Sequence, residues 1–166
     1  YTVLGTFLSL IGNLSLGYVL SRPKFIFKKV LNIYILIPML FSGGLIPTFL
    51  VIKALGLYNT IWALVLPGAV GTWNCILVRT FFKTTIPEGI IEASYMDGAN
   101  HFQILIYVVL PLSKTIIAII GLFTAVGIWN DYFNALIYLT NKNLYPLQLY
   151  LKDILSAQTN MANISG

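Results

Sequence analysis

The chain has 166 residues, of which 58% are hydrophobic and only 9% are charged, and its formal net charge is +5. Its apolar residues occur in long blocks, which argues against an ordinary soluble domain and predicts a membrane protein. Its basic residues are dispersed around these blocks rather than gathered in one stripe, which argues against a nucleic-acid-binding surface.

Four apolar runs are long enough to cross a bilayer, since a helix needs about 20 residues to span the roughly 30 Å hydrocarbon core. They predict membrane spans at about residues 1–20, 30–52, 58–79 and 112–140. A soluble helical core is the alternative, but soluble helices keep a polar face and the first three runs have none. The predicted fold class is therefore an all-α, polytopic transmembrane helix bundle.

The first run carries a face of small residues. Gly5, Ser9 and Gly12 follow one another at spacings of four and three, so they lie on one side of a helix. Small residues let the backbone of another helix approach closely. This face is predicted to serve ordinary helix packing.

Helix breakers interrupt the second and third runs. They are Pro38, Gly43, Gly44 and Pro47 in the second run, and Pro67 and Gly68 in the third. Proline removes a helical hydrogen bond, so the freed backbone groups need partners in neighbouring helices or in a water-filled cavity. An undisturbed helix is not expected in either run.

Basic residues indicate the orientation, because Lys and Arg in short loops prefer the cytoplasmic side. Four of them lie between the first two runs: Arg22, Lys24, Lys28 and Lys29. If this connection is cytoplasmic, alternation makes residues 80–111 a second cytoplasmic loop and residues 141–166 an external, polar tail. Seven of the ten Lys and Arg residues then face the cytoplasm.

Five Lys, Asp, Glu and His residues lie between the last two runs, and two of them, Glu88 and Glu92, belong to one predicted helix. Pro87 suits the start of this helix, Glu88 is favourable near its positive end, and the pattern continues to Met96. Glu92, Met96 and Ala99 follow at spacings of four and three, which predicts one face with a carboxylate, a flexible thioether and a small residue. Such a face suits docking onto a partner.

A sharp turn and a second helix are predicted next. Asp97 and Gly98 favour a turn, and Asn100 with Gln103 three residues later resembles a capping box. The second helix is predicted to continue to Pro111. The segment therefore reads as helix, turn and helix outside the bilayer core.

EASYMDGA, followed at a distance by VVLPLSK, resembles the EAA loop of ABC importer permeases. The residues that match that pattern in type and order are Glu92, Ala93, Gly98, Leu110 and Pro111. Ser94 replaces the usual second alanine, which is a change between small residues. The resemblance implies that this loop docks into a cleft of a cytoplasmic ATPase subunit through Glu92, Ala93, Met96, Asp97, Gly98 and Ala99.

The resemblance covers nearly the whole chain and is strongest to permeases of the carbohydrate-uptake branch, especially those for complex oligosaccharides such as aldouronates. It implies ATP-driven import across a bacterial plasma membrane by alternating access. The implied partners are the ATPase, which binds the ATP, a second permease subunit, an extracytoplasmic solute-binding lipoprotein, and the membrane lipid. Family members usually have six spans, so one span before Tyr1 and one after Gly166 are expected to be missing.

Polar and aromatic residues gather in two places, within the third predicted span and near the outer end of the fourth. They are Trp73, Asn74, Trp129, Asn130, Asp131, Tyr132 and Asn134. Aromatic faces stack on sugar rings while amides and carboxylates pair with hydroxyls, so these residues are candidates for a substrate path or a receptor contact. An interfacial aromatic belt is the alternative. Asp131 favours function slightly, because a carboxylate within a span needs a partner or water.

Other functions fit less well. The chain has one histidine and no GxSxG, HExxH or GxxxxGK motif, so neither an enzyme nor a cofactor or metal site is expected. A secondary transporter shares the broken helices and the carboxylate within a span, but it leaves the docking loop unexplained. A structural scaffold would have no use for either feature.

Overall fold

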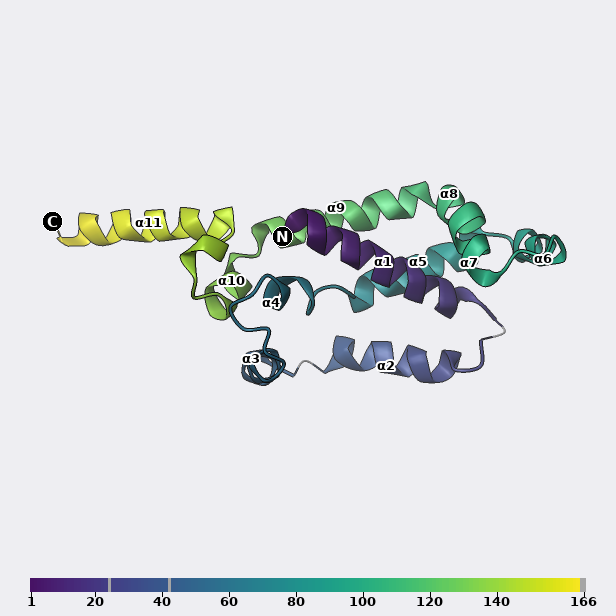
Figure 1. The fold of residues 1–166 in the computed structure, drawn as a ribbon, viewed down its shortest axis with the longest axis horizontal. Coiled ribbons are helices and arrows are strands. Elements are labelled where there is room, and N and C mark those ends of the chain that lie inside the picture. Colours follow the sequence, from purple (N-terminus) through teal and green to yellow (C-terminus); the bar gives the residue numbers. More distant parts are fainter. Residues whose placement is uncertain (24, 42, 165–166) are drawn as a thin grey trace.

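The computed structural model describes residues 1–23, 25–41 and 43–164, and side chains as far as Ser156. Every regular element in this part of the chain is a helix, which confirms the all-α class (Figure 1). The elements are α1 (Thr2–Ser21), α2 (Lys28–Leu40), α3 (Leu45–Ala54), α4 (Trp62–Val65), α5 (Thr72–Thr85), α6 (Glu88–Met96), α7 (His101–Ile104), the π-helical turn η1 (Leu105–Val109), α8 (Leu110–Leu112), α9 (Lys114–Asn130), α10 (Tyr132–Tyr138), the 3₁₀ turn η2 (Lys142–Leu144) and α11 (Leu147–Ile164).

Three helices form the body of the molecule. α1 packs along both α5 and α9, and α2 contacts α1 and α5 from one side. Figure 1 shows α6 at one end of this body, whereas α11 projects from the opposite end. The molecule is therefore elongated, with α6 and α11 at its two extremes.

The predicted small face of α1 leaves no room for larger side chains at its glycines. A Cβ built at Gly5 would lie 2.6 Å from Cδ1 of Ile128 on α9, and one built at Gly12 would lie 2.8 Å from a valine side chain before α5. Gly17 marks another close approach, about 140° around the helix from Gly12, because a Cβ built there would lie 2.5 Å from Cγ1 of Val78 on α5. The packing role of these glycines is confirmed.

Asn13, on the same helix, is fully buried beside the break that precedes α5. Its Nδ2 donates to the carbonyl of Ser9 at 2.8 Å and to the carbonyl of Ala69 at 3.4 Å. Ala69 belongs to the non-helical segment after Pro67, so a side chain of α1 provides a partner for backbone that the helix break has freed.

The main hydrophobic core lies toward α6. It joins the second half of α1, the second half of α5, α6, the α7 to α8 segment and the start of α9. Its buried members are Leu14, Tyr18, Val78, Phe82, Ile86, Ile91, Ile104, Val109, Ile116 and Ile120. Two smaller clusters at the opposite end join α3, α4 and α10, and α10 with α11.

The predicted spans are mostly not single helices. Within the described residues, only α1 is both long and apolar enough to cross a membrane by itself. The segment His101–Leu112 and α9 meet these criteria together, but their axes differ by 84°. The second run divides between α2 and α3 at the predicted pair Gly43 and Gly44, whereas Pro38 lies inside α2 and Pro47 in the first turn of α3. The third run divides between α4 and α5 at Pro67 and Gly68, as predicted.

Three boundaries differ from the prediction. The run at 112–140 divides at Asp131, which caps a new helix, α10. α5 continues to Thr85, so the first residues of the predicted loop at 80–111 are helical. The predicted polar tail contains the helix α11, because Leu147, Leu151 and the apolar residues after them recur at helical spacing. Lys24, one of the basic residues from which the orientation was predicted, lies outside the described residues.

Asn59 joins two connections at the end of the molecule away from α6. It has a φ of 60°, and its backbone N–H donates to the carbonyl of Tyr138 at 2.9 Å. Its Oδ1 accepts the backbone N–H groups of Thr140 at 3.0 Å and Asn141 at 2.9 Å. We call this arrangement the Asn59 clasp.

Candidate functional site

The predicted helix, turn and helix form as expected between Pro87 and Ser113. Pro87 is the N-cap of α6, and Glu88 lies in the first turn, where the helix dipole favours a carboxylate. At the other end, Gly98 has a φ of 83° and its N–H donates to the carbonyl of Tyr95 at 3.0 Å. Glycine suits this left-handed position because it has no Cβ to clash.

The predicted capping box of α7 is confirmed. The N–H of Gln103 donates to Oδ1 of Asn100, and the N–H of Asn100 donates to Oε1 of Gln103, both at 2.9 Å. The helix then passes through the π-helical turn η1 and ends one residue beyond Pro111, in α8. Both ends of the turn therefore have their backbone groups satisfied by local partners.

Two further contacts hold α6 in place. Ile91, which is 3% exposed, belongs to the main core together with Ile86 and Ile104. The hydroxyl of Tyr95 is hydrogen-bonded to Nδ1 of His101, and the two rings meet edge to face. We call this pair the Tyr95–His101 bridge; the sequence analysis did not identify it.

The side chains of the predicted docking face point in different directions. Glu92, Ala93 and Asp97 are exposed, and Met96 is 88% exposed, so these residues are free to meet a partner. Ala99 is different: it lies beyond the turn and packs against the main core. The prediction that it shares a helix face with Glu92 and Met96 is wrong, because the helix ends before it.

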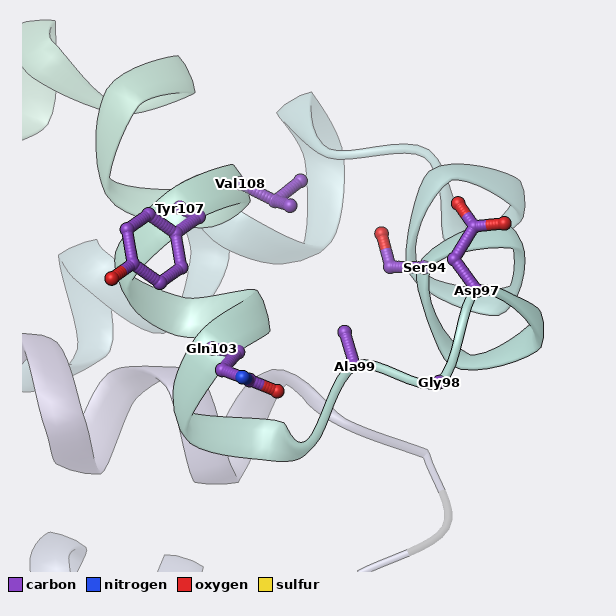
Figure 2. A pocket seen from close by; sticks show the side chains of 7 residues that line it. All are labelled: Ser94, Asp97, Gly98, Ala99, Gln103, Tyr107 and Val108. Carbon is purple, nitrogen blue, oxygen red and sulfur yellow. The ribbon is translucent and has the colours of Figure 1, made fainter.

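Hollows flank α6 on two sides. A cleft of about 740 Å³ is lined by Glu88, Ile91, Glu92 and Tyr95 of α6, by Tyr18, Val19 and Arg22 of the end of α1, and by Pro23, Phe25 and His101. A smaller hollow of about 380 Å³ lies between α6 and the α7 to η1 segment. Figure 2 shows its lining residues, Ser94, Asp97, Gly98, Ala99, Gln103, Tyr107 and Val108.

The two hollows open on opposite faces of α6, since Ser94 follows Glu92 by about 200° around the helix. Asp97 and the turn residues belong to the smaller hollow, whereas Glu92 belongs to the larger cleft. The predicted docking residues are therefore spread around a projecting helix rather than gathered in one pocket.

Trp73 and Asn74 lie at the start of α5. Trp73 is 59% exposed, whereas Asn74 is half-buried and its Nδ2 lies 3.4 Å from Oγ1 of Thr124 on α9. This contact brings the polar start of α5 to the half of α9 that ends at Trp129 and Asn130. Trp129 is 52% exposed, and Nδ2 of Asn130 donates to a carbonyl of its own helix.

Asp131 and Asn134 form a helix cap. Oδ1 of Asp131 accepts the N–H of Asn134 at 3.2 Å, and Oδ2 accepts its Nδ2 at 2.8 Å. Nζ of Lys152 on α11 lies 4.3 Å from the ring centroid of Tyr132. The sequence analysis assigned Asp131 no capping role, although the Asp-x-x-Asn spacing is a recognisable signal for one.

The helical fold, with its broken apolar helices and an EAA-type loop at one end, defines a membrane component of an ABC importer. The chain belongs to the family described as the binding-protein-dependent transport system inner membrane component, which matches residues 6–160. Family membership confirms the resemblance noted from the sequence.

Among its relatives, the polygalacturonan/rhamnogalacturonan transport system permease protein YtcP of Bacillus subtilis (strain 168) is 42% identical over 160 residues, which cover 96% of this chain and 56% of the relative. Protein LplC of the same organism is 40% identical over 153 residues, covering 92% and 52%. The chain thus spans about half the length of these relatives.

A solved structure is also similar. It is the crystal structure of a bacterial ABC transporter involved in the import of the acidic polysaccharide alginate, and one of its chains matches with a TM-score of 0.89 and 39% identity. The match covers 92% of this chain and 54% of that chain. The arrangement of helices described above is therefore the permease fold.

Proposed function

We propose that the chain is part of a permease subunit that imports a carbohydrate by alternating access, driven by a separate cytoplasmic ABC ATPase. The proposed assembly also contains a second permease subunit and an extracytoplasmic solute-binding lipoprotein. ATP is bound and hydrolysed by the ATPase, so the permease is not an enzyme and needs no cofactor of its own.

One observation carries this proposal: one side of α6 packs against the core, whereas another side is exposed and available to a partner. Ile91 belongs to the core, and the Tyr95–His101 bridge ties the end of the helix to α7. Glu92 and Met96 are meanwhile exposed on a helix that stands at one end of the body (Figure 1). A rigid helix in this position can pass the movement of an ATPase to α5, which precedes it directly, and to α9 through the α7 to α8 segment.

Membrane insertion of the broken runs belongs to the same proposal. Large apolar side chains are exposed along α2, where Leu40 is 75% exposed, and along α9, where Leu122 is 62% exposed. Such surfaces need lipid or another membrane subunit to cover them. We therefore assign four spans to residues 1–20, 30–52, 58–79 and 112–140, with breaks inside the last three.

A carbohydrate substrate is supported by two independent points. The permease relatives include one named for polygalacturonan and rhamnogalacturonan, and a similar structure is named for alginate import. Aromatic rings and amides gather where α5 begins and α9 ends, joined by the contact between Asn74 and Thr124. We assign this region to the substrate path or the receptor contact.

Truncation of Glu92 tests the coupling. Glu92→Ala in the full-length permease removes a charge from an exposed docking surface, and loss of a charge-assisted contact costs about 2 kcal/mol or more. We expect less ATPase to copurify and sugar uptake to fall. Thr84→Ala is the control, because Thr84 is an exposed residue of α5 whose hydroxyl donates within its own helix.

Both variants should insert in the membrane to the same extent. Wild-type uptake together with a full complement of ATPase in the Glu92→Ala permease would remove Glu92 from the docking surface. A different result, in which no ATPase copurifies even with the wild-type protein, would favour the secondary-transporter alternative.

A further inference from the structure

Basic side chains from three helices converge at the end of the molecule that carries α6. Arg22 follows α1, Lys28 begins α2, and Arg79 and Lys83 lie in the second half of α5. α2 packs against α5, and Nζ of Lys28 donates to the carbonyl of Arg22 at 3.1 Å. A Cβ built at Gly17 would lie 3.1 Å from the backbone nitrogen of Arg79, so α5 reaches α1 at this level.

These four side chains are not neutralised by carboxylates. Within the described residues, none of them forms an ion pair with Asp or Glu. Burial and the nearby charges of Arg79, Lys83 and Arg22 lower the pKa of Lys28, and Glu88 only partly offsets this effect. The fold therefore holds like charges close together, which is unfavourable unless an anion joins them.

The position of this cation cluster decides which anion is suitable. Lys28 lies directly before the apolar run at 30–52, and Arg79 lies at the end of the run at 58–79. With the spans proposed above, the cluster stands at the boundary between hydrocarbon and headgroups, so the inference rests on those spans. Basic pockets between membrane helices on the cytoplasmic side attract anionic headgroups. A phosphodiester offers two charged oxygens that a guanidinium and ammonium groups can share.

We infer that Arg22, Lys28, Arg79 and Lys83 form a binding site for the phosphate group of an anionic phospholipid. The bound headgroup bridges the start of α2 to the end of α5. This inference goes beyond the proposed import function, and it requires no ATPase, receptor or sugar for its test.

Lipid retention by the full-length protein provides the test. The protein is presented with equal amounts of phosphatidylglycerol and phosphatidylcholine in mixed micelles, and retained lipids are counted by native mass spectrometry. We expect the wild type to retain phosphatidylglycerol preferentially. Lys28→Gln and Lys83→Gln should each reduce that affinity about fivefold, a factor that corresponds to about 1 kcal/mol per basic residue.

Two kinds of control variant show whether the effect depends on the cluster and on its charge. Lys53→Gln and Lys142→Gln remove exposed lysines that lie away from the cluster, and they should leave the preference unchanged. Lys28→Arg and Lys83→Arg keep the charge and should restore it. Equal retention of both lipids by the wild type, or an unchanged preference in both Gln variants, would overturn the inference.

Competition with inorganic phosphate shows whether the cluster binds the phosphate group of a lipid or free phosphate. At millimolar concentration it should leave the retained phosphatidylglycerol in place, because the acyl chains also hold a lipid in the micelle. If phosphate instead displaces phosphatidylglycerol and itself remains bound, the cluster is a site for free phosphate and the assignment to a lipid is wrong.

Discussion

Tyr95 and His101 face each other across the turn between α6 and α7, with their ring centroids 5.2 Å apart. Their hydrogen bond joins the last turn of one helix to the first residue of the next. The turn is therefore spanned by side chains as well as by backbone. Contacts within the chain therefore hold α6 and α7 at their angle without the help of a partner.

The first prediction concerns this bridge. Tyr95→Phe keeps the ring but removes the hydroxyl, and a typical hydrogen bond contributes about 1 kcal/mol. Amide hydrogen exchange in α6 should accelerate about fivefold, since local opening reports local stability. Tyr107→Phe is the control, because Tyr107 is 75% exposed and its hydroxyl has no hydrogen bond within the described residues. Equal exchange in both variants would show that the bridge adds no stability.

The second prediction concerns the turn itself. Gly98→Ala puts a Cβ on a residue with a φ of 83°, which costs about 1–2 kcal/mol. Gly89→Ala adds the same methyl group inside α6, where nothing lies within 4 Å, and alanine favours a helix. Thermal unfolding of the purified full-length protein should show a lower midpoint for the first variant only. A similar midpoint for both would mean that the turn relaxes without strain.

The third prediction concerns Gly17, where α1 meets α5. In Gly17→Ala the new methyl group would meet Cγ1 of Val78 at 2.5 Å and Cβ at 2.9 Å, so α1 and α5 must separate. Overpacking of this kind costs about 1–3 kcal/mol. Gly127→Ala on α9 meets nothing within 4 Å and serves as the control. We expect only Gly17→Ala to lower the unfolding midpoint in detergent, and a Gly17→Ala/Val78→Ala double variant to recover part of the loss.

The fourth prediction separates the two roles open to Asp131. Asparagine caps helices about as well as aspartate, whereas alanine loses about 0.5–2 kcal/mol. Asp131→Asn should therefore keep the unfolding midpoint, and Asp131→Ala should lower it. If Asp131 also lies on the substrate path or meets the receptor, Asp131→Asn should still reduce sugar uptake. Normal uptake with Asp131→Asn would leave Asp131 with the capping role alone.

The fifth prediction concerns topology. In a Cys75→Ser background, Asn100→Cys and Asn143→Cys each introduce one exposed thiol at opposite ends of the molecule. With residues 80–111 cytoplasmic, an impermeant thiol reagent applied to intact cells should label position 143 and leave position 100 unlabelled. Permeabilised cells should allow both to react. Labelling of position 100 from outside would reverse the orientation.

Local signals made part of the structure predictable from sequence. The segment from Pro87 to Gln103 was predicted closely because its cap, turn and second cap each depend on residues a few positions apart. Ala99 was misassigned for a related reason: a helical spacing was extended through Gly98, where the backbone reverses. Helical spacing indicates a shared face only for residues of one helix, and α6 ends at Met96.

Long-range contacts were beyond the reach of sequence patterns. The Tyr95–His101 bridge and the hydrogen bond from Asn13 to Ala69 depend on how elements meet, and each residue alone has many possible roles. The division of the last run at Asp131 could have been found from its capping signal. A carboxylate in an apolar run fits two roles, a polar group that is costly in lipid and a cap that satisfies backbone, and the length of the run favours the first.

The Asn59 clasp has a consequence for biosynthesis. Its side chain accepts hydrogen bonds from residues that follow it by 81 and 82 positions. At about 5–20 residues per second, the ribosome delivers those partners roughly 4–16 s after Asn59 itself. During that interval the connection between α3 and α4 lacks these hydrogen-bond partners, so the α10 end cannot assemble fully until Thr140 and Asn141 have been synthesised. Slow translation between the two connections would prolong this partly assembled state.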